Sequence, residues 1–390
     1  MQIITSLLDN DLYKFTMLQA FHHYEKNTES KYEFRCRTPN ADLKNLVNRI
    51  NDEIDNLCTL TFNKDELDYL STLPFIRSEF IDFLKHFKLN RININIHLDK
   101  NNDLQINIKG FITEVSLFEV PVLAIISEIY CRSQLSENEA YKNGIIKLDK
   151  KINRLISSNK KIIFSDFGTR RRYSREWQEI VVKQIIDSKY KYFIGTSNVY
   201  LAKKYGIKPI GTMAHEWIMA HAGVTRIDKS DQLALQRWLD FYKGELSIAL
   251  TDTYTSDHFL SGFIKNTATE YRGIRHDSGD WKEWAYKFID HYKKLGIDPH
   301  TKTLLFSDGL DFKLIEEIYD ELNTKTQVAY GIGTNLTNDV GVKALQIVIK
   351  MTECDGFPLI KISDTPGKVI CINEMFKEFA LDYFKKFKLS

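Results

Sequence analysis

The second half of the chain repeats one pattern: a short apolar run ends in small or polar residues and is followed by residues with helical spacing. Seven runs follow this pattern: Lys161–Arg170, Tyr192–Ser197, Lys208–His215, Ser247–Tyr254, Gly273–Asp280, Thr303–Asp311 and Val328–Asn335. Strands that alternate with helices indicate parallel β/α units. Strands that are apolar throughout are typical of a sheet buried on both faces. Seven units favour an irregular β/α barrel over a Rossmann sheet.

The residues that follow these apolar runs point to an enzyme. In β/α barrels the carboxyl ends of the strands carry the chemistry. Here those ends hold nearly all the Asp, Arg, His, Ser, Thr and Gly clusters of the repeated region. This placement is the strongest functional signal that the pattern itself provides.

The residues before the repeats predict an additional α+β module. Lys31–Cys36 reads as a strand, and Arg91–Leu98 and Leu104–Phe111 read as a hairpin. Thr113–Ser133 predicts a buried helix and Glu137–Ser158 a long polar one. A second hairpin is expected in the C-terminal strands, which should return to the N-terminal module. The predicted division is therefore an N-terminal module at 1–115, the barrel with the active site at 116–345, and C-terminal strands and tail at 346–390.

Composition excludes several classes of protein. A net charge of +2 gives no field that would favour nucleic acid or a membrane surface. Five scattered cysteines without paired spacing argue against a disulfide framework and a zinc site. The stretch Met1–Phe15 lacks the features of a signal peptide, and Val120–Tyr130 is too short to span a bilayer. We therefore expect a cytoplasmic protein with no nucleic-acid or membrane partner.

Two neighbouring strand ends have the composition of a phosphate site. Tyr330–Asn335 is rich in glycine, and its backbone amides could cradle a phosphate, although a tight turn between strand and helix is the alternative. Asp308 and Gly309 follow the preceding strand. Two such loops side by side strengthen the phosphate hypothesis.

Carboxylates at two other strand ends suit a sugar. Asp277 and Asp252 could hold vicinal hydroxyls, whereas Asp280 could simply cap the helix that follows it. Two acids without a pair of histidines do not predict a dedicated metal site. They fit ribose together with Mg²⁺ that arrives on a phosphorylated substrate.

An arginine and a histidine complete the candidate site. Arg170 follows a strand most closely and could hold an anion through its planar fork, whereas Arg171 and Arg172 could belong to a solvated helix face. His215 stands at the start of a helix after a predicted short strand. Taken alone, it could be a histidine that only caps or packs.

Eight segments, in order along nearly the whole chain, resemble the nicotinate phosphoribosyltransferase family: Asp9–Met17, Ser165–Ser174, Gly195–Ala202, Gly211–Trp217, Asp252–Asp257, Arg275–Asp280, Ser307–Asp311 and Gly331–Asn335. The resemblance implies an irregular α/β barrel of the type II phosphoribosyltransferase kind with an added module. It also implies synthesis of nicotinate mononucleotide and pyrophosphate from nicotinate and phosphoribosyl pyrophosphate, coupled to ATP hydrolysis, in NAD salvage. A homodimer that shares residues across its interface, with Mg²⁺ carried by phosphoribosyl pyrophosphate and ATP, is expected.

The resemblance also assigns roles to residues. His215 matches the histidine that the family phosphorylates from ATP, and Asp252 and Asp277 should hold ribose hydroxyls. Tyr13 (from the partner subunit) and Phe167 should stack on the pyridine, and Arg170 should contact the nicotinate carboxylate or the substrate phosphate. The other substrate-binding roles fall on Ser197, Thr212 and Arg275 around the nicotinate, and on Asp308, Gly309, Gly333 and Thr334 at the 5′-phosphate.

Ser197 bears on the choice of substrate. It stands where nicotinamide-using relatives carry an Asp, which would accept a bond from an amide and repel a carboxylate. Nicotinate is therefore expected over nicotinamide. Nicotinamide or quinolinate phosphoribosyltransferase activity, or a barrel that binds phosphorylated metabolites without catalysis, remain the alternatives.

Overall fold

The computed structural model describes residues 2–387, which form parts of two compact units. The first unit comprises Met1–Asn27, Tyr32–Gly211 and Ile332–Lys350, and the second comprises Thr28–Lys31, Thr212–Gly331 and Met351–Ser390. These bounds differ from the predicted division at residues 115 and 345, because chain order does not reveal which segments return to an earlier part of a fold. Between residues 2 and 387, no helix has both the length and the apolar composition needed to cross a membrane.

The first unit contains the predicted antiparallel hairpin. Strands β2 (Ile94–Leu98) and β3 (Leu104–Phe111) pair with Ile96 opposite Ile106, so alternate isoleucines share the buried face. Strand β1 (Glu29–Cys36) follows β3 in the sheet, and β10 (Ile347–Cys354) follows β1. The predicted strands and hairpin of this part of the chain are thus confirmed, except that Arg91–Asn93, the start of one predicted strand, forms a 3₁₀ turn before β2.

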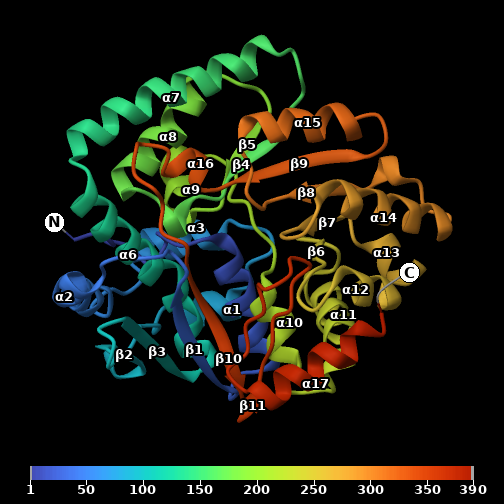
Figure 1. The fold of residues 1–390 in the computed structure, drawn as a ribbon, viewed down its shortest axis with the longest axis horizontal. Helices are drawn as coiled ribbons and strands as arrows, with labels where there is room; N and C mark the ends of the chain where they lie inside the picture. The colour runs from blue at the N-terminus through green and yellow to red at the C-terminus, as the bar shows by residue number, and fades with distance from the viewer. Residues whose placement is uncertain (1, 388–390) are drawn as a thin grey trace. The chain divides into compact units, whose positions relative to one another are not determined.

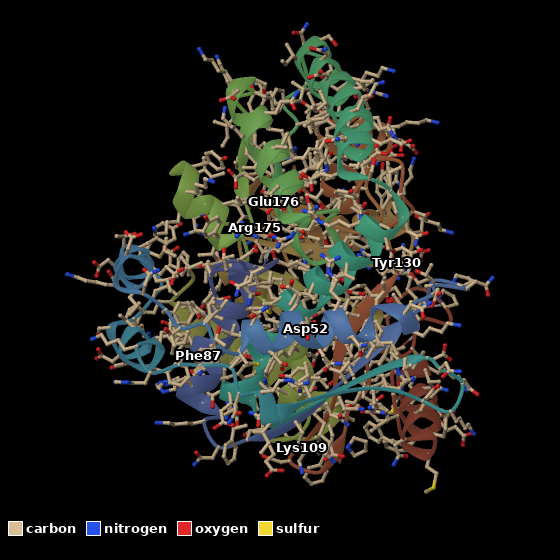
Figure 2. The ribbon with its side chains drawn as sticks, turned by 90° about the vertical axis from the view of Figure 1, so that its left-hand side faces the viewer. Asp52, Phe87, Lys109, Tyr130, Arg175 and Glu176 are labelled. Atoms are coloured by element: carbon tan, nitrogen blue, oxygen red, sulfur yellow. The ribbon has the colours of Figure 1, made fainter. Side chains whose placement is uncertain are left out.

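Helices cover much of the first unit, which also holds the parallel pair β4 (Phe164–Asp166) and β5 (Phe193–Thr196). Its helices are α1 (Leu12–Tyr24), α2 (Val47–Leu57), α3 (Lys64–Ser71), α4 (Ser78–Leu84), α5 (Ile112–Val115), α6 (Glu119–Gln134), α7 (Glu137–Ser157), α8 (Arg175–Asp187), α9 (Val199–Tyr205) and α16 (Thr334–Thr337). Figure 2 shows one side of this unit, with Asp52 on α2, Tyr130 on α6, and Arg175 and Glu176 at the start of α8.

The predicted buried helix between residues 113 and 133 is interrupted. Helix α5 ends at Val115, a 3₁₀ turn follows over Ser116–Phe118, and α6 then begins at Glu119. Pro121 lies in the first turn of α6, where its missing amide leaves no helical hydrogen bond unmade. The apolar composition alone did not reveal this break.

Four parallel strands form the centre of the second unit: β6 (Ile248–Leu250), β7 (Gly273–His276), β8 (Thr303–Phe306) and β9 (Gln327–Ile332). They are hydrogen-bonded in the order β9-β8-β7-β6, and helices α14 (Trp281–Lys294) and α15 (Phe312–Leu322) lie beside them (Figure 1). The remaining helices of the central segment are α10 (His215–His221), α11 (Ser230–Tyr242), α12 (Ser256–Gly262) and α13 (Lys265–Glu270). Because β6 is an end strand, the parallel strands form an irregular arrangement and not a closed barrel.

Six of the seven predicted β/α runs form strands, and Lys208–His215 does not. Pro209 makes one isolated bridge with Thr196, and the chain stays extended until α10 begins at His215. Proline has no amide to donate to a strand ladder, which accounts for the missing strand.

The C-terminal segment ends in a helix that the sequence analysis did not predict. Strand β10 turns at Asp355–Gly356 into β11 (Phe357–Pro358), as the predicted hairpin requires. Helix α17 (Glu374–Lys385) follows, and within the second unit its Phe384 stacks on Tyr254 with ring centroids 4.7 Å apart.

Candidate active site

His215 is the first residue of α10 and is almost fully buried, with 3% of its surface exposed. Its Nε2 lies 3.1 Å from Asp277 Oδ2, and its Nδ1 lies 3.0 Å from Thr253 Oγ1. Burial, followed by the nearby charge of Lys361, lowers the pKa of His215 to about 4, so the ring is neutral at pH 7. An ionised carboxylate only accepts hydrogen bonds, so the proton belongs on Nε2 and the lone pair on Nδ1. Both ring nitrogens of His215 are therefore hydrogen-bonded, which holds the ring in one orientation.

Asp277 follows β7 and has both carboxylate oxygens engaged. Oδ2 faces His215, and Oδ1 accepts a hydrogen bond from Ser307 Oγ at 3.0 Å. Burial raises the pKa of Asp277, but the bond to His215 and the charge of Arg275 outweigh it, and the pKa lies well below its usual range. Asp277 is therefore an anion that orients the imidazole.

Asp252 follows β6 and has one oxygen left over. Its Oδ2 accepts hydrogen bonds from Ser278 Oγ and from Lys361 Nζ, the latter at 3.1 Å. Its Oδ1 is buried, has no hydrogen-bond partner, and lies 3.9 Å from His215 Nε2. A buried acceptor without a partner is costly unless a ligand or water completes it. This oxygen is the clearest mark of a ligand position in the second unit.

The histidine and the two carboxylates also come close enough to share a cation. One ligand atom from each of His215, Asp252 and Asp277 falls within 4.8 Å of the others. The sequence analysis looked for a pair of histidines and did not predict this cluster. The donor set suits a hard divalent cation such as one carried by a phosphorylated substrate.

The other predicted residues of the second unit occupy neighbouring strand ends. Thr212 Oγ1 donates to the carbonyl of Ile248 at 3.1 Å, and Arg275 Nη2 donates to that of Met213 at 3.4 Å. Asp308 lies 3.5 Å from Lys368 Nζ, and Gly309 has a left-handed φ of +59°. A phosphate at this position would meet Lys368 and the amide of Gly309 more favourably than the carboxylate of Asp308.

A cavity of about 610 Å³ in the second unit has an acidic lining. It is lined by Ser278 and Gly279 together with residues of α14, α17 and the 362–369 segment. Its lining includes four acids (Asp257, Asp280, Glu283 and Asp364) and two lysines (Lys287 and Lys385). Asp280 caps α14 through the amides of residues 282 and 283, as its alternative interpretation predicted. The acidic lining disfavours an anionic substrate.

In the first unit, the predicted stacking and phosphate residues lie side by side. The amide of Phe167 donates to the carbonyl of Ile332 at 2.8 Å, which sets the β4 loop beside Gly333 and Thr334. Gly168 permits this approach, because a Cβ there would lie 2.2 Å from Thr337 Oγ1. Arg170 lies in the same loop, with Nη1 3.6 Å from Glu119 Oε1.

Arg172 is not on a solvated helix face, which corrects the sequence interpretation. It is fully buried and binds Asp9 with both terminal nitrogens, at 2.6 and 2.7 Å. Burial raises the pKa of Asp9, but the charge of Arg172 and, to a smaller extent, a hydrogen bond from Asn198 outweigh it, and the pKa lies below the usual range. Arg171, by contrast, is half-buried, and its Nη1 donates to Gln346 Oε1 at 2.9 Å. The buried pair joins the loop that carries Arg170 to the segment before α1 that carries Asp9.

Ser197 lies beside the start of α1 in its own chain. The carbonyl of Ser197 accepts from the amide of Leu12 at 2.8 Å, and Ser197 Oγ donates to Asp11 Oδ1 at 2.7 Å. Burial raises the pKa of Asp11 to about 6 despite this bond. Residue 197 is not an acid, but its hydroxyl contacts one, Asp11, which lies two residues before Tyr13 in the sequence. The separation of Asp11 and Ser197 along the chain gives no indication of this contact.

The comparisons with known proteins identify the family of the chain. The N-terminal domain of the nicotinate phosphoribosyltransferase (NAPRTase) family matches residues 8–127, and the main family model matches residues 162–387. The chain belongs to the nicotinate phosphoribosyltransferase family. A nicotinate phosphoribosyltransferase from Chromobacterium violaceum is 43% identical, over 98% of this chain and 97% of that protein.

Solved nicotinate phosphoribosyltransferase structures share the whole fold. The enzyme from Vibrio cholerae superposes with a TM-score of 0.93 at 36% identity, over 98% of this chain and 94% of the other. The one from Porphyromonas gingivalis gives a TM-score of 0.92 at 32% identity, over 99% and 100%. The predicted fold class is confirmed by these neighbours.

Sequence reasoning missed several residues that contact the predicted ones. They are Asp11, Thr253, Ser278, Ser307, Lys361 and Lys368. Ser278 and Ser307 stand next to predicted residues at strand ends and could have been included. Lys361 had one signal, a charged residue between Ile360 and Ile362 in an apolar strand pattern.

The raised pKa of Asp11 predicts a pH-dependent stability. Asp11 keeps its proton up to about pH 6 when folded, but gives it up near 3.8 when unfolded. Its stabilising contribution is therefore fully present below pH 3.8 and is lost as pH rises through 6. Asp11→Asn removes this titration. The unfolding free energy of the variant minus that of the wild type should therefore rise by up to about 3 kcal/mol between pH 4 and pH 7.5.

Urea unfolding of both proteins at the two pH values measures this difference. Asp364, whose pKa burial also raises to about 6, titrates in both proteins and cancels. An equal difference in unfolding free energy at pH 4 and pH 7.5 would show that Asp11 does not titrate as described.

Proposed function

We propose that this protein joins nicotinate to phosphoribosyl pyrophosphate, giving nicotinate mononucleotide and pyrophosphate, as a step of NAD salvage. Membership of the nicotinate phosphoribosyltransferase family supports the reaction class. The observation that carries the proposal in the structure is the cluster of buried His215 and Asp252 with half-buried Asp277, which has one unpartnered carboxylate oxygen, Asp252 Oδ1. Such an oxygen suits a ribose hydroxyl.

The reaction needs no protein nucleophile. The bond from ribosyl C1 to the pyrophosphate oxygen breaks, and its electron pair leaves with Mg²⁺-bound pyrophosphate. The pyridine nitrogen lends its lone pair to the new bond at C1, which passes through an oxocarbenium-like state. Fixed carboxylates near the ribose, Asp252 and Asp277, would stabilise that positive charge without reorganising.

His215 is proposed to couple ATP hydrolysis to this reaction. The lone pair of a neutral imidazole nitrogen attacks the γ-phosphorus of ATP, and the bond to the bridging oxygen breaks as ADP leaves. Water later hydrolyses the phosphohistidine. The neutral ring and the contact with Asp277 suit a nucleophile, because Asp277 can orient the proton-bearing Nε2 and keep the lone pair on Nδ1, which faces the hydroxyl of Thr253. A phosphoryl group adjacent to the substrate residues would change their charge balance and so their affinity.

The nicotinate end of the substrate is assigned to Tyr13, Phe167, Ser197 and Thr212. Arg170 and Arg275 remain the two candidates for its carboxylate, and Asp308, Gly309, Gly333 and Thr334 are assigned to the 5′-phosphate. We also propose a homodimer in which Tyr13 serves the partner's site, and a cytoplasmic location. Ser197 supports nicotinate over nicotinamide, although the neighbouring Asp11 means that the selectivity depends on more than this one position.

One assay separates this function from its alternatives. The protein is incubated with Mg²⁺ and phosphoribosyl pyrophosphate, with nicotinate, nicotinamide or quinolinate, each with and without ATP, and mononucleotide formation is followed. We expect product from nicotinate, with ATP raising kcat/KM. Preference for nicotinamide or decarboxylation of quinolinate would identify the other transferases, and absence of product from all three would indicate a binding protein.

A further inference from the structure

Lys361 is a buried lysine that no part of the proposed reaction uses so far. Its surface is 8% exposed, and its Nζ lies 3.1 Å from Asp252 Oδ2. Its backbone is fixed in two places: it exchanges hydrogen bonds with Ile370, and the amide of Ile362 donates to the carbonyl of Thr253. The segment that carries Lys361 is therefore attached directly to the loop that carries Asp252.

The same segment reaches Asp252 by a second route, through Ser278. Ser278 Oγ donates to Asp252 Oδ2 and accepts from the amide of Asp364 at 3.0 Å. The carboxylate of Asp364 in turn accepts from the amide of Ser256 at 2.8 Å and from its hydroxyl. We call residues 361–365 the C-terminal clamp, because they grip the loops after β6 and β7 together.

Both routes end on the same oxygen of Asp252, and this determines what the other oxygen can do. With Oδ2 held by Lys361 and Ser278, the carboxylate cannot rotate, and Oδ1 is left buried without a partner. Lys361 also supplies positive charge where two carboxylates, Asp252 and Asp277, approach one histidine. Burial raises the pKa of Asp252, but Lys361 is the largest of the influences that lower it.

We propose that Lys361 is a positioning residue for substrate binding: together with Ser278 it holds Asp252 so that Oδ1 presents a fixed acceptor to a ribosyl hydroxyl. This inference rests on the proposed function, since it assigns the ribose of a phosphorylated ribosyl substrate to that oxygen. It extends the active site to the C-terminal clamp, which lies more than 25 residues beyond the last strand of the parallel sheet.

Lys361→Met tests the role of the charge at nearly constant side-chain length. Loss of a charge-assisted hydrogen bond predicts a roughly ten- to hundredfold fall in kcat/KM for phosphoribosyl pyrophosphate. Lys361→Arg retains the charge and should recover part of this loss. Lys302→Met is the matched control, because Lys302 is equally buried in the second unit and donates only to the carbonyls of Thr269 and Tyr271. Thermal unfolding of each variant separates loss of fold from loss of function.

A double-mutant cycle distinguishes positioning from general support of the fold. Lys361 acts through Asp252, so adding Lys361→Met to Asp252→Asn should cost little beyond Asp252→Asn alone. Ser278→Ala should show the same coupling with a smaller loss. Wild-type kcat/KM in a folded Lys361→Met, or losses that multiply in the double variant, would overturn the role of Lys361.

Direct binding separates this inference from the proposed function. Calorimetric titration with phosphoribosyl pyrophosphate and Mg²⁺ should show weaker binding to Lys361→Met than to the wild type and to Lys302→Met. If the wild type forms no product but still binds phosphoribosyl pyrophosphate more tightly than Lys361→Met does, the proposed reaction is refuted and the role of the clamp is supported. An active wild type with equal affinities in all three would refute the clamp alone.

Discussion

Arg172→Met should lower the free energy of unfolding by about 3–5 kcal/mol, because it leaves the buried carboxylate of Asp9 without its cation. The guanidinium is fully buried, binds both oxygens of Asp9, and also contacts Gln178. The main energetic penalty lies in desolvating the remaining charge and not in the loss of one bond. Denaturant unfolding followed by circular dichroism measures the change.

The neighbouring arginine provides the control. Arg171→Met removes the same chemical group from a half-buried position, where it bonds Gln346, and should change the stability by about 1 kcal/mol or less. The double variant Asp9→Leu with Arg172→Met removes both charges and should recover much of the loss. Destabilisation of less than about 1 kcal/mol by Arg172→Met alone would contradict the buried-pair account.

These two arginines show what spacing in a sequence can and cannot reveal. Three consecutive arginines after a strand predict positive charge near the site, and Arg170 does lie in the loop after β4. Nothing in the local sequence separates Arg171 from Arg172, because their fates depend on Asp9, more than 160 residues away. The partner, and not the pattern, determines which charge is buried.

The fold was predictable where one local signal was sufficient. Apolar runs such as Thr303–Phe306 become parallel strands because only buried strands tolerate such a composition. The prediction failed at Lys208–His215, where Pro209 removes a donor. It also missed α17, which buries Ala380 and Phe384 but leaves other apolar side chains, such as Met375, exposed. The two discontinuous units were also beyond reach, since they depend on where the chain returns.

The candidate site divides in the same way. Asp252, Asp277 and the Ser307 loop follow β6, β7 and β8, and parallel neighbours place their carboxyl ends at one edge, so their proximity follows from topology. His215 lies with them at the start of α10. The family resemblance placed His215 in the site, whereas the periodicity of the sequence could not. Lys361 joins from the C-terminal clamp, and only coordinates bring it to Asp252.

His215→Ala should abolish the coupling to ATP while leaving some transfer at high substrate concentration. The side chains of Asp252 and Asp277, which are assigned to the ribose, remain in this variant. The uncoupled reaction therefore keeps its stabilisation of positive charge. Coupling between binding events is usually worth roughly five- to 150-fold, so ATP should raise kcat/KM of the wild type by a factor in that range. In His215→Ala the ratio with and without ATP should fall to about 1, and ³²P from labelled ATP should no longer appear in an acid-labile phosphoprotein.

His221→Gln is the matched control for this prediction. His221 lies in the same helix and is equally buried, but its Nδ1 contacts only the carbonyl of Trp217, 2.7 Å away, and a glutamine amide can donate to that carbonyl. This variant should keep both the ATP effect and the phosphoprotein. If ATP still raised kcat/KM in folded His215→Ala, the coupling would have to run through another residue. If labelling persisted there while coupling was lost, His215 would transmit the effect without being the phosphorylated group.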